Sequence, residues 1–327
     1  MSPRRDALLD WLQNDLQLAV DSLQPASADA SFRYYFRAHI DGEYFVVMDA
    51  PPEHEPIDRF LEVADALQAI GVHSPEILHF SKLEGFILME DLGATTFLEK
   101  LPLATDELYS QALQALVKIQ SAVNSPTTFS PPLYSQPFLE QEMDLFEQWY
   151  AVKHLGCTLS PQQQETWHQL KTTIGNTWFE QPQVWVHRDY HSRNLMVTEN
   201  RSPGVIDFQD MMLGPITYDL ASLFKDCYIQ WPRTRQLAWL RQWQGMIADA
   251  VKGYSFSEEQ FIRWYDFTGL QRHLKVLGIF CRLHYRDGKP QYLEDLPLVR
   301  RYVTETLTEY PELNQFAELF QSLPHHE

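Results

Sequence analysis

The sequence predicts an α+β protein, with a small, mainly antiparallel β part at its N-terminal end followed by a larger helical part. Short apolar segments with strand spacing and intervening turn residues concentrate in the chain before Gly93. After that position, apolar residues recur at the three- and four-residue intervals of a helix. With 327 residues, of which 44% are hydrophobic, the chain is long enough for one large globular domain or two smaller ones.

The N-terminal part is expected to open with a helix over residues 4–18, in which leucines recur every four residues. The spacing then changes to that of a strand, because apolar and aromatic side chains in SFRYYFRA alternate with a set that includes both arginines. Asp41-Gly42 is a two-residue turn sequence and leads into a second strand, EYFVVM. These segments predict a hairpin.

A second helix is expected to end near Gly71, since glycine is common just after the last turn of a helix. Its apolar face is formed by Phe60, Val63, Leu67 and Ile70. The apolar runs EILHF and GFILM follow and predict two more strands. After the first helix, the expected order is therefore strand, strand, helix, strand, strand.

The sequence becomes helix-rich after MEDLG, and a helix is expected from about Asp106 onward. We therefore divide the chain into an N-terminal lobe of residues 1–93, with a hinge at residues 89–93, and a C-terminal lobe of residues 94–327. The segment 124–137 is rich in Pro and Ser and is expected to be a long surface connection.

The stretch HRDYHSRN places Asp189 and Asn194 five residues apart in a polar loop, and VIDFQD follows with Asp207. Phosphoryl transfer from ATP requires an acceptor hydroxyl in line with the γ-phosphate and cations on the phosphate oxygens. In the kinase pattern His-Arg-Asp-x-x-x-x-Asn, the Asp orients the hydroxyl and accepts its proton, and the Asn binds Mg²⁺. A short hairpin between LMV and GVID would place Asp207 where the kinase Asp-Phe-Gly segment binds Mg²⁺. Together, the three residues predict a kinase active site.

Other residues of this region have structural roles or a rival chemistry to consider. Asp219 is expected to cap a helix and brace the catalytic loop, and His187 to make structural hydrogen bonds. His187, Asp189 and His191 also form a His-x-Asp-x-His pattern, which would suit Zn²⁺ or iron in a hydrolase. That alternative leaves Asn194 unexplained, so the kinase interpretation is preferred.

The segments WVHRDYHSRNLMV and GVIDFQDMMLGPITYDLASL resemble the aminoglycoside phosphotransferase and choline kinase family. His191 is typical of small-molecule kinases in this group, whereas protein kinases usually have lysine at that position. The resemblance implies a bilobal protein-kinase-like fold. Within the family, DASFRYYFR, VVMDAPPE and LQRHLKVLGIFCRLHYRDGK are most similar to bacterial kinases that phosphorylate the C1 hydroxyl of N-acetylmuramate and N-acetylglucosamine during peptidoglycan recycling.

The family resemblance implies ATP and Mg²⁺ as cofactors. Asp189 would be the catalytic base, and Asn194 and Asp207 would bind the metal ion. The MEDL segment would be the hinge, where the backbone of Glu90 and Leu92 would hold the adenine ring.

The phosphates would lie against the turn between the first strands, formed by Ser31, Phe32 and Arg33, although this turn lacks the glycines of a glycine-rich loop. In YFVVMDAPP, Met48 occupies the position of the lysine that reaches the phosphates in kinases. Another cation is expected to replace that lysine. The candidates are Arg33, Arg37 and Lys82, although the two arginines could equally belong to a solvated strand face.

The acceptor sugar is expected to bind the helical lobe. Arg272, His273 and Lys275 would pair with the lactyl carboxylate of N-acetylmuramate, or would form an exposed basic patch. Several aromatic residues could stack on a sugar ring, but core packing is their expected role: Trp149, Tyr150, Trp231, Trp264 and Tyr265.

The composition bears on partners and location. A formal net charge of −18 disfavours nucleic acid and anionic membranes as partners, because their phosphates would be repelled. No apolar run reaches the roughly 18 residues of a membrane span, and the first residues do not match a signal peptide. Cys157, Cys227 and Cys281 show no Cys-x-x-Cys spacing, which favours reduced thiols and a cytoplasmic protein. A monomer and a homodimer are both compatible with the sequence.

Two other functions stay open at this point. Another small-molecule kinase, acting on an aminoglycoside, choline or an amino acid, would share every catalytic residue and differ in the acceptor pocket. The strong acidity of the chain suits a cationic acceptor such as an aminoglycoside. Met48 instead keeps open a catalytically silent kinase fold that binds a nucleotide or a partner.

Overall fold

The computed structural model describes residues 3–28, 32–125, 127, 129–250 and 256–324. The chain packs into two compact units. The first consists of Met1–Ala112, Pro126–Ser130 and Asn194–Gln209, and the second of Leu113–Ser125, Pro131–Arg193 and Asp210–Glu327. This division follows packing alone, so the nucleotide-binding lobe of residues 1–93 with its hinge at 89–93 stays a prediction.

The first unit is built on a five-stranded antiparallel sheet with the strand order β1-β2-β3-β5-β4. Its strands are β1 (Val20–Ala28), β2 (Tyr34–Ile40), β3 (Glu43–Asp49), β4 (Ile77–Ser81) and β5 (Phe86–Glu90). Ile40 pairs with Glu43 across the turn, so the predicted hairpin is confirmed. β1 was not predicted, because Pro25 and several polar residues interrupt the alternation. It lies at the edge of the sheet, where proline is tolerated.

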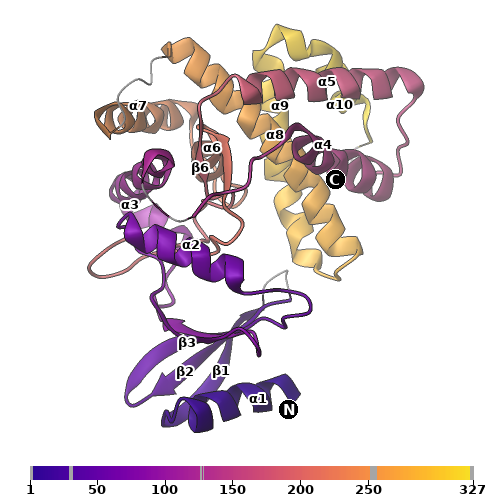
Figure 1. Ribbon diagram of the computed structural model, residues 1–327. Coiled ribbons are helices and arrows are strands. Elements are labelled where there is room, and N and C mark those ends of the chain that lie inside the picture. The colour runs from indigo at the N-terminus through magenta and orange to yellow at the C-terminus, as the bar shows by residue number, and fades with distance from the viewer. Residues whose placement is uncertain (1–2, 29–31, 126, 128, 251–255, 325–327) are drawn as a thin grey trace. The chain divides into compact units, whose positions relative to one another are not determined.

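Helices cover both faces of this sheet. α1 (Pro3–Asp10) continues as the π-helical turn η1 (Trp11–Asp15), so the helix expected over residues 4–18 ends earlier and changes its winding. It packs against the sheet through a buried apolar cluster of Leu8, Trp11, Leu12, Leu23, Ala38, Ile40, Val47, Phe86 and Leu88. Figure 1 shows α2 (Asp58–Ala69), the second predicted helix, on the opposite side of the sheet from α1.

The predicted hairpin of β7 (Leu195–Met196) and β8 (Gly204–Val205) is present and belongs to the first unit. It is attached to the segment that follows β5. Met196 forms a β-bridge with Thr96, and the Val197 N–H donates to the Thr95 carbonyl oxygen at 2.9 Å. The two ends of the hairpin, which carry the predicted metal ligands, are thus fixed relative to the hinge segment.

α3 (Phe97–Ser121) begins earlier than the expected start near Asp106. It contains Pro102, and Ala104 has a non-helical backbone with φ −142° and ψ 43°. Proline removes a backbone donor and breaks the regular winding, so only the part after this break has clear helical periodicity in the sequence. Within the described ranges, no helix is long and apolar enough to cross a membrane.

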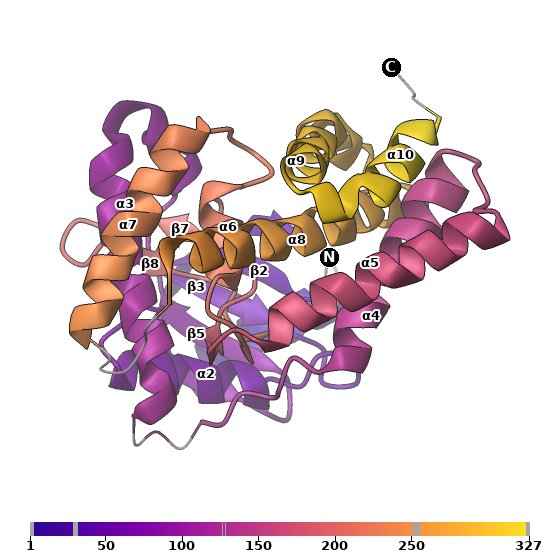
Figure 2. The ribbon, with the colours of Figure 1, turned by 90° about the horizontal axis from the view of Figure 1, so that it is seen from above.

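In the second unit, β6 (Gln183–Val186) pairs antiparallel with β9 (Met212–Pro215). The central helix is α8 (Glu258–Tyr285), which α4, α5, α6 and α9 contact (Figure 2). The other helices are η2 (Ala122–Asn124), α4 (Gln136–Leu145), η3 (Phe146–His154), α5 (Pro161–Phe179), α6 (Tyr218–Phe224), α7 (Arg233–Ala250), η4 (Pro290–Asp295), α9 (Leu296–Glu309), η5 (Pro311–Leu313) and α10 (Asn314–Ser322).

Candidate active site

The predicted catalytic loop follows β6 and is held at its start by Asp219. Asp219 is fully buried in the first turn of α6. Its Oδ2 accepts from the His187 N–H at 2.7 Å, and its Oδ1 accepts from the Arg188 N–H at 3.0 Å. Arg188 has a φ of 78°, a left-handed conformation that is costly for a residue other than glycine and that these bonds help to maintain. Asp219 therefore braces the loop, as the sequence predicted. The expected helix cap is wrong, because Thr217 is the N-cap of α6 and Asp219 lies inside the first turn.

The far end of the loop is held by Asp226, which sequence reasoning missed. Its Oδ2 accepts from the backbone N–H of Ser192 at 3.0 Å and from the Ser192 hydroxyl. Its Oδ1 accepts from the Tyr228 N–H at 3.0 Å, and only 1% of Asp226 is exposed. Because Asp226 lies 34 residues from Ser192 along the chain, no local motif signals this contact.

Asp189 lies in the loop between these two anchored ends. Burial raises the pKa of its carboxyl group, but the charges of Lys275, Arg188 and Arg272, together with the neighbouring His191, outweigh burial and lower the pKa below its usual value. Asp189 is therefore ionised at neutral pH, which is the state that a proton acceptor requires.

The two histidines of the His-x-Asp-x-His pattern pack edge-on against aromatic rings. His187 is fully buried beside Tyr190, and His191 lies beside Tyr228. Burial lowers the pKa of His191, so its ring is neutral at pH 7. Among the residues that the structure describes, no group of three or more His, Cys, Asp or Glu side chains is placed to hold a metal ion. The zinc or iron alternative therefore gains no support.

The two predicted metal ligands come together in the first unit. Asn194 Nδ2 donates to Asp207 Oδ2 at 3.2 Å, and Gln209 Nε2 donates to Asp207 Oδ1 at 2.9 Å. Asp207 has a φ of 62° and is the second left-handed residue of the two motifs. Carboxylate and amide oxygens, completed by phosphate oxygens and water, are the ligands that Mg²⁺ takes in phosphoryl-transfer enzymes. The side chains of Asn194 and Asp207 fit that ion.

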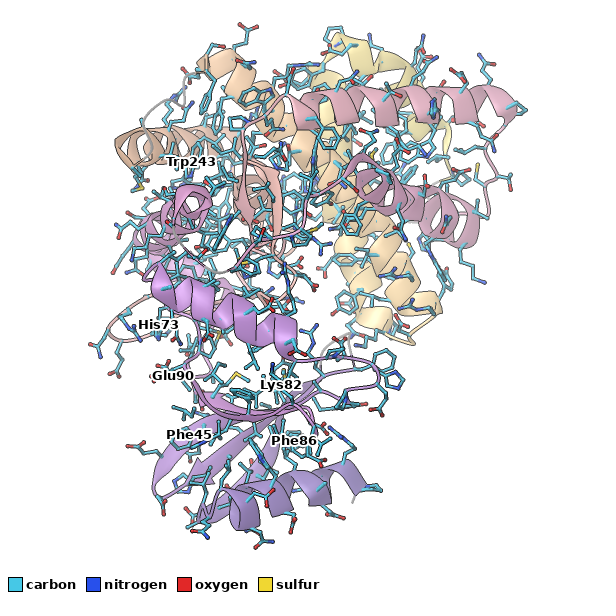
Figure 3. The ribbon with its side chains drawn as sticks, in the orientation of Figure 1. Phe45, His73, Lys82, Phe86, Glu90 and Trp243 are labelled. Carbon is cyan, nitrogen blue, oxygen red and sulfur yellow. The ribbon has the colours of Figure 1, made fainter. Side chains whose placement is uncertain are left out.

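The predicted hinge is anchored through Glu90. Its Oε1 lies 3.3 Å from His73 Nε2, and its Oε2 accepts from the Glu76 N–H at 3.2 Å (Figure 3). Leu92 is buried, and a Cβ atom added to Gly204 would lie 2.7 Å from Leu92 Cδ1. The glycine therefore lets β8 pack closely against Leu92 of the predicted hinge.

Arg33 is the candidate cation that is electrostatically linked to Asp207. It is buried, and its Nε donates to Glu55 Oε2 at 3.3 Å. Burial alone would lower the pKa of Arg33, but Tyr35, Glu55 and Asp207 raise it above its ordinary value. Arg33 therefore keeps a permanent positive charge, and Asp207 is one of the groups that favour its charged form.

The other two candidate cations have partners elsewhere. Arg37 forms an ion pair with Asp91, and its guanidinium carbon lies 4.4 Å from the centre of the Tyr44 ring. Lys82 is exposed and pairs with Asp58 at 2.6 Å, and Figure 3 marks its position. Asp207 is among the groups that raise the pKa of Arg33, so Arg33 is the strongest of the three candidates.

The remaining residues of the predicted phosphate turn differ in exposure. Phe32 is 58% exposed and stacks on His54 with 4.7 Å between the ring centres. Ser31 lies outside the described residues. Met48 is buried in the sheet and supplies no charge.

Arg272, His273 and Lys275 are all buried on α8, so the expectation of an exposed basic patch is wrong. Only 3% of Arg272 is exposed, and its guanidinium carbon lies 5.5 Å from the centre of the Tyr218 ring. Its Nε and Nη1 have no hydrogen-bond partner among the described residues. A buried guanidinium with unpaired N–H groups is well suited to receive an anionic or strongly polar acceptor group.

The two neighbours of Arg272 have partners inside the second unit. Lys275 donates to the Tyr218 hydroxyl at 3.0 Å and forms an ion pair with Glu142 at 3.2 Å. His273 Nε2 lies 3.0 Å from the carbonyl oxygen of Lys225, and burial lowers the pKa of this histidine well below its usual value. Sequence reasoning missed Glu142, because it lies 133 residues from Lys275 along the chain.

Comparison with known proteins decides the family. Residues 22–255 match the phosphotransferase enzyme family. The chain belongs to this family.

Three relatives of this phosphotransferase have the name N-acetylmuramate/N-acetylglucosamine kinase. The one from Pseudomonas aeruginosa is 43% identical over 303 residues, which cover 92% of this chain and 88% of the relative. The one from Pseudomonas putida is 40% identical over 333 residues, with 98% and 96% covered. The one from Neisseria meningitidis is 39% identical over 317 residues, with 95% and 93% covered. These matches confirm the predicted family.

Solved structures of low sequence identity share the fold of this phosphotransferase. A choline kinase from Streptococcus pneumoniae has a TM-score of 0.66 at 12% identity, and 94% of this chain and 99% of that chain are covered. An ADP-bound aminoglycoside phosphotransferase has a TM-score of 0.61 at 16% identity, with 94% and 99% covered. The predicted α+β, protein-kinase-like fold is therefore confirmed.

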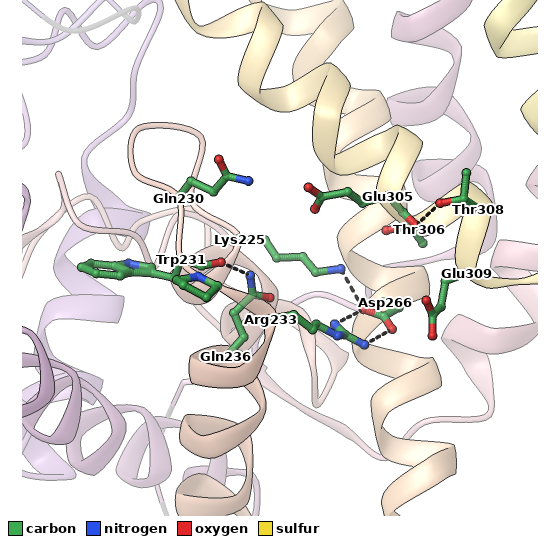
Figure 4. A pocket seen from close by; sticks show the side chains of 11 residues that line it. Lys225, Gln230, Trp231, Arg233, Gln236, Asp266, Glu305, Thr306, Thr308 and Glu309 are labelled. Atoms are coloured by element: carbon green, nitrogen blue, oxygen red, sulfur yellow. Dashed lines mark hydrogen bonds and ion pairs between the residues drawn. The ribbon is translucent and has the colours of Figure 1, made fainter.

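The aromatic residues considered for sugar stacking are mainly packed inside the second unit of the phosphotransferase. Tyr150, Trp264 and Tyr265 are buried, as expected for core residues, and Trp149 is half-buried. Trp231 lines a pocket of about 380 Å³, shown in Figure 4 together with the charged side chains Lys225, Arg233, Asp266, Glu305 and Glu309.

Proposed function

We propose that this phosphotransferase transfers the γ-phosphoryl group of ATP to the C1 hydroxyl of N-acetylmuramate or N-acetylglucosamine. The observation that supports this function most strongly is the match, at 39% to 43% identity over nearly the whole chain, to kinases with these sugars in their names. A cytoplasmic monomer or homodimer without nucleic-acid or membrane partners stays a prediction from composition.

The residues of the first unit supply the nucleotide side of the proposed reaction. The backbone of Glu90 and Leu92 would hold the adenine ring, and Arg33 would take the place of the lysine that is missing at Met48. Phe32 and Ser31 would border the phosphates. Asn194 and Asp207 would hold Mg²⁺, which neutralises charge on the phosphate oxygens when it is bound.

Asp189 would accept the proton of the sugar hydroxyl. An anomeric hydroxyl is more acidic than an ordinary alcohol, so the proton needs to leave only late and positioning contributes most of the rate. The anchored ends of the catalytic loop, at Asp219 and Asp226, would hold the carboxylate in a fixed orientation for this step.

Arg272 would face the acceptor and pair with the lactyl carboxylate of N-acetylmuramate, because part of its guanidinium has no partner within the described residues. Lys275 and His273 were predicted with it as acceptor residues. Because they bind Glu142, Tyr218 and Lys225, these two residues would support Arg272 and would not contact the sugar themselves in this proposal.

A coupled assay of ADP release with a panel of acceptors tests the function. We expect turnover with N-acetylmuramate and N-acetylglucosamine, and none with choline or kanamycin. Phosphorus NMR of the product should show coupling to the single C1 proton, whereas phosphorylation at C6 would show coupling to two protons. Turnover with choline or kanamycin alone would identify a different small-molecule kinase. Nucleotide binding by calorimetry without any turnover would identify a silent kinase fold.

A further inference from the structure

Glu142 is a buried carboxylate on α4 that receives four hydrogen-bond donors. Its Oε1 accepts from Arg188 Nη2 at 2.7 Å and from Lys275 Nζ at 3.2 Å. Its Oε2 accepts from the Tyr134 hydroxyl and from Gln271 Nε2, the latter at 3.3 Å. Burial raises the pKa of Glu142, but Lys275 and Arg188 outweigh it and lower the pKa, so Glu142 is ionised at neutral pH.

The two cations that Glu142 holds also act on the proposed base. Arg188 immediately precedes Asp189 in the catalytic loop, and Lys275 comes from α8. Both lower the pKa of Asp189 through their positive charge, as Arg272 does. Glu142 and Asp189 therefore share the charges of the same two side chains.

We propose that Glu142 is a positioning residue for Asp189, because it keeps Lys275 and Arg188 on its own carboxylate and limits how strongly they hold the base. Buried cations that lose a counterion turn to the nearest remaining anion, since an unpaired buried charge is costly. Without the charge of Glu142, Asp189 is a carboxylate that still acts on both cations. A carboxylate held in two close ion pairs is a weaker acceptor for the proton of a substrate hydroxyl. This inference rests on the proposed function, with Asp189 as the base.

The first test is Glu142→Gln, which removes the charge and keeps the volume of the side chain. We expect kcat to fall by about 10- to 100-fold, a part of the roughly 10²–10⁴-fold contribution of a general base. The KM for ATP should stay close to the wild-type value, because the residues assigned to the nucleotide belong to the first unit. Glu142→Asp retains the charge and should recover much of the lost kcat.

The double variant Glu142→Gln/Lys275→Met separates positioning from a purely structural role. If Lys275 inhibits Asp189 once Glu142 is neutral, removing its ammonium group should raise kcat about tenfold above that of Glu142→Gln alone. Coupling of this size is known between residues in contact. A structural role of Glu142 predicts that the double variant is at least as inactive as the single one, and that result would overturn the proposal.

Asp266 provides a matched control, because it is also a buried carboxylate that holds two cations in the second unit. It accepts from Lys225 Nζ at 2.8 Å and from Arg233, as Figure 4 shows. Asp266→Asn should destabilise the fold, as judged by thermal unfolding, and should leave kcat unchanged. If the wild-type protein phosphorylates neither sugar, the proposed function fails. If the wild-type protein phosphorylates at least one of the sugars but the double variant shows no recovery of kcat, only the role of Glu142 fails.

Discussion

Asn194 Nδ2 lies 3.2 Å from Asp207 Oδ2, although the two residues are thirteen positions apart along the chain. The short hairpin of β7 and β8 brings them together, and the Ile206 N–H donates to the Asn194 carbonyl oxygen at 3.1 Å where the hairpin closes. The backbone of the hairpin therefore holds these two residues close together. A change in one side chain should alter ion binding without displacing the other side chain.

Asn194→Ala should weaken the metal site. We expect the Mg²⁺ concentration for half-maximal activity to rise by at least about tenfold, the scale of change found for residues that support a metal ion. Initial rates over a range of Mg²⁺ at saturating ATP and sugar measure this. Asn200→Ala, an exposed residue of the same hairpin connection, is the control. Equal Mg²⁺ dependence in the two variants would remove Asn194 from the site.

Arg33→Ala should raise the KM for ATP by about 10- to 100-fold, since a hydrogen bond to a charged group contributes about 1.5–3 kcal/mol. The physical reason is that Arg33, whose pKa Asp207 helps to raise, would take the place of the missing strand lysine in the proposed function. Lys82→Ala is the matched control, because Lys82 is exposed and pairs with Asp58. If Lys82→Ala affects ATP more than Arg33→Ala does, the assignment of the cation is wrong.

Asp189→Asn should reduce kcat by about 10²–10⁴-fold, which corresponds to about 3–6 kcal/mol of activation free energy. The affinity for ATP, measured by calorimetry, should be retained, because the loop stays anchored by Asp219 and Asp226. Turnover near the wild-type rate would show that Asp189 is not the base.

Arg272→Ala should impair N-acetylmuramate more than N-acetylglucosamine, since only the former carries a lactyl carboxylate. We expect kcat/KM for N-acetylmuramate to fall by about tenfold more, in line with a charge-assisted hydrogen bond. Steady-state kinetics with both sugars decide the matter. An equal loss of kcat/KM for the two sugars would mean that Arg272 does not bind the lactyl carboxylate.

Asp219 should make stability depend on pH. Burial raises its pKa to about 7 in the folded protein, although the N–H groups of His187 and Arg188 lower it. In the unfolded chain the pKa is about 3.9, so between these values only the unfolded chain loses the proton. The free energy of unfolding therefore falls as pH rises from about 4 to about 7, by about 1.4 kcal/mol per pH unit.

Asp219→Asn cannot titrate and should lack this contribution. Urea unfolding of both proteins at several pH values between 4 and 8 measures it. The stability of the wild type minus that of the variant should decline with rising pH up to about 7. Parallel curves would mean that Asp219 keeps an ordinary pKa in the fold.

The sequence predicts the parts of the site that lie within one short stretch, and their roles stay predictions. Asp189, Asn194 and Asp207 belong to motifs with fixed local spacing, so their chemistry could be predicted. Asp226 and Glu142 bind partners that are distant in the chain. Ser192 lies 34 positions from Asp226, and Arg188 lies 46 positions from Glu142. An ordinary acidic residue in a helix gives no sign of such contacts before the chain is folded.

The misjudged parts of the fold have similar causes. β1 contains Pro25 and little alternation, so its only strand signal is the neighbour with which it pairs, β2. Arg272 and Lys275 occupy one helical face and were compatible with an exposed patch. Their burial depends on α4, whose Glu142 supplies the counter-charge for Lys275. Tertiary contacts decided what local periodicity could not.

Helix α6 sets the spacing between the two residues that hold the catalytic loop. One support, Asp219, lies in its first turn, and the other, Asp226, lies just past its last residue. Adding or removing a residue between Arg188 and Ser192 would pull a peptide N–H away from one of the two supports. The two supports therefore constrain the number of peptide units in this loop, because they bind backbone N–H groups and not the loop side chains alone.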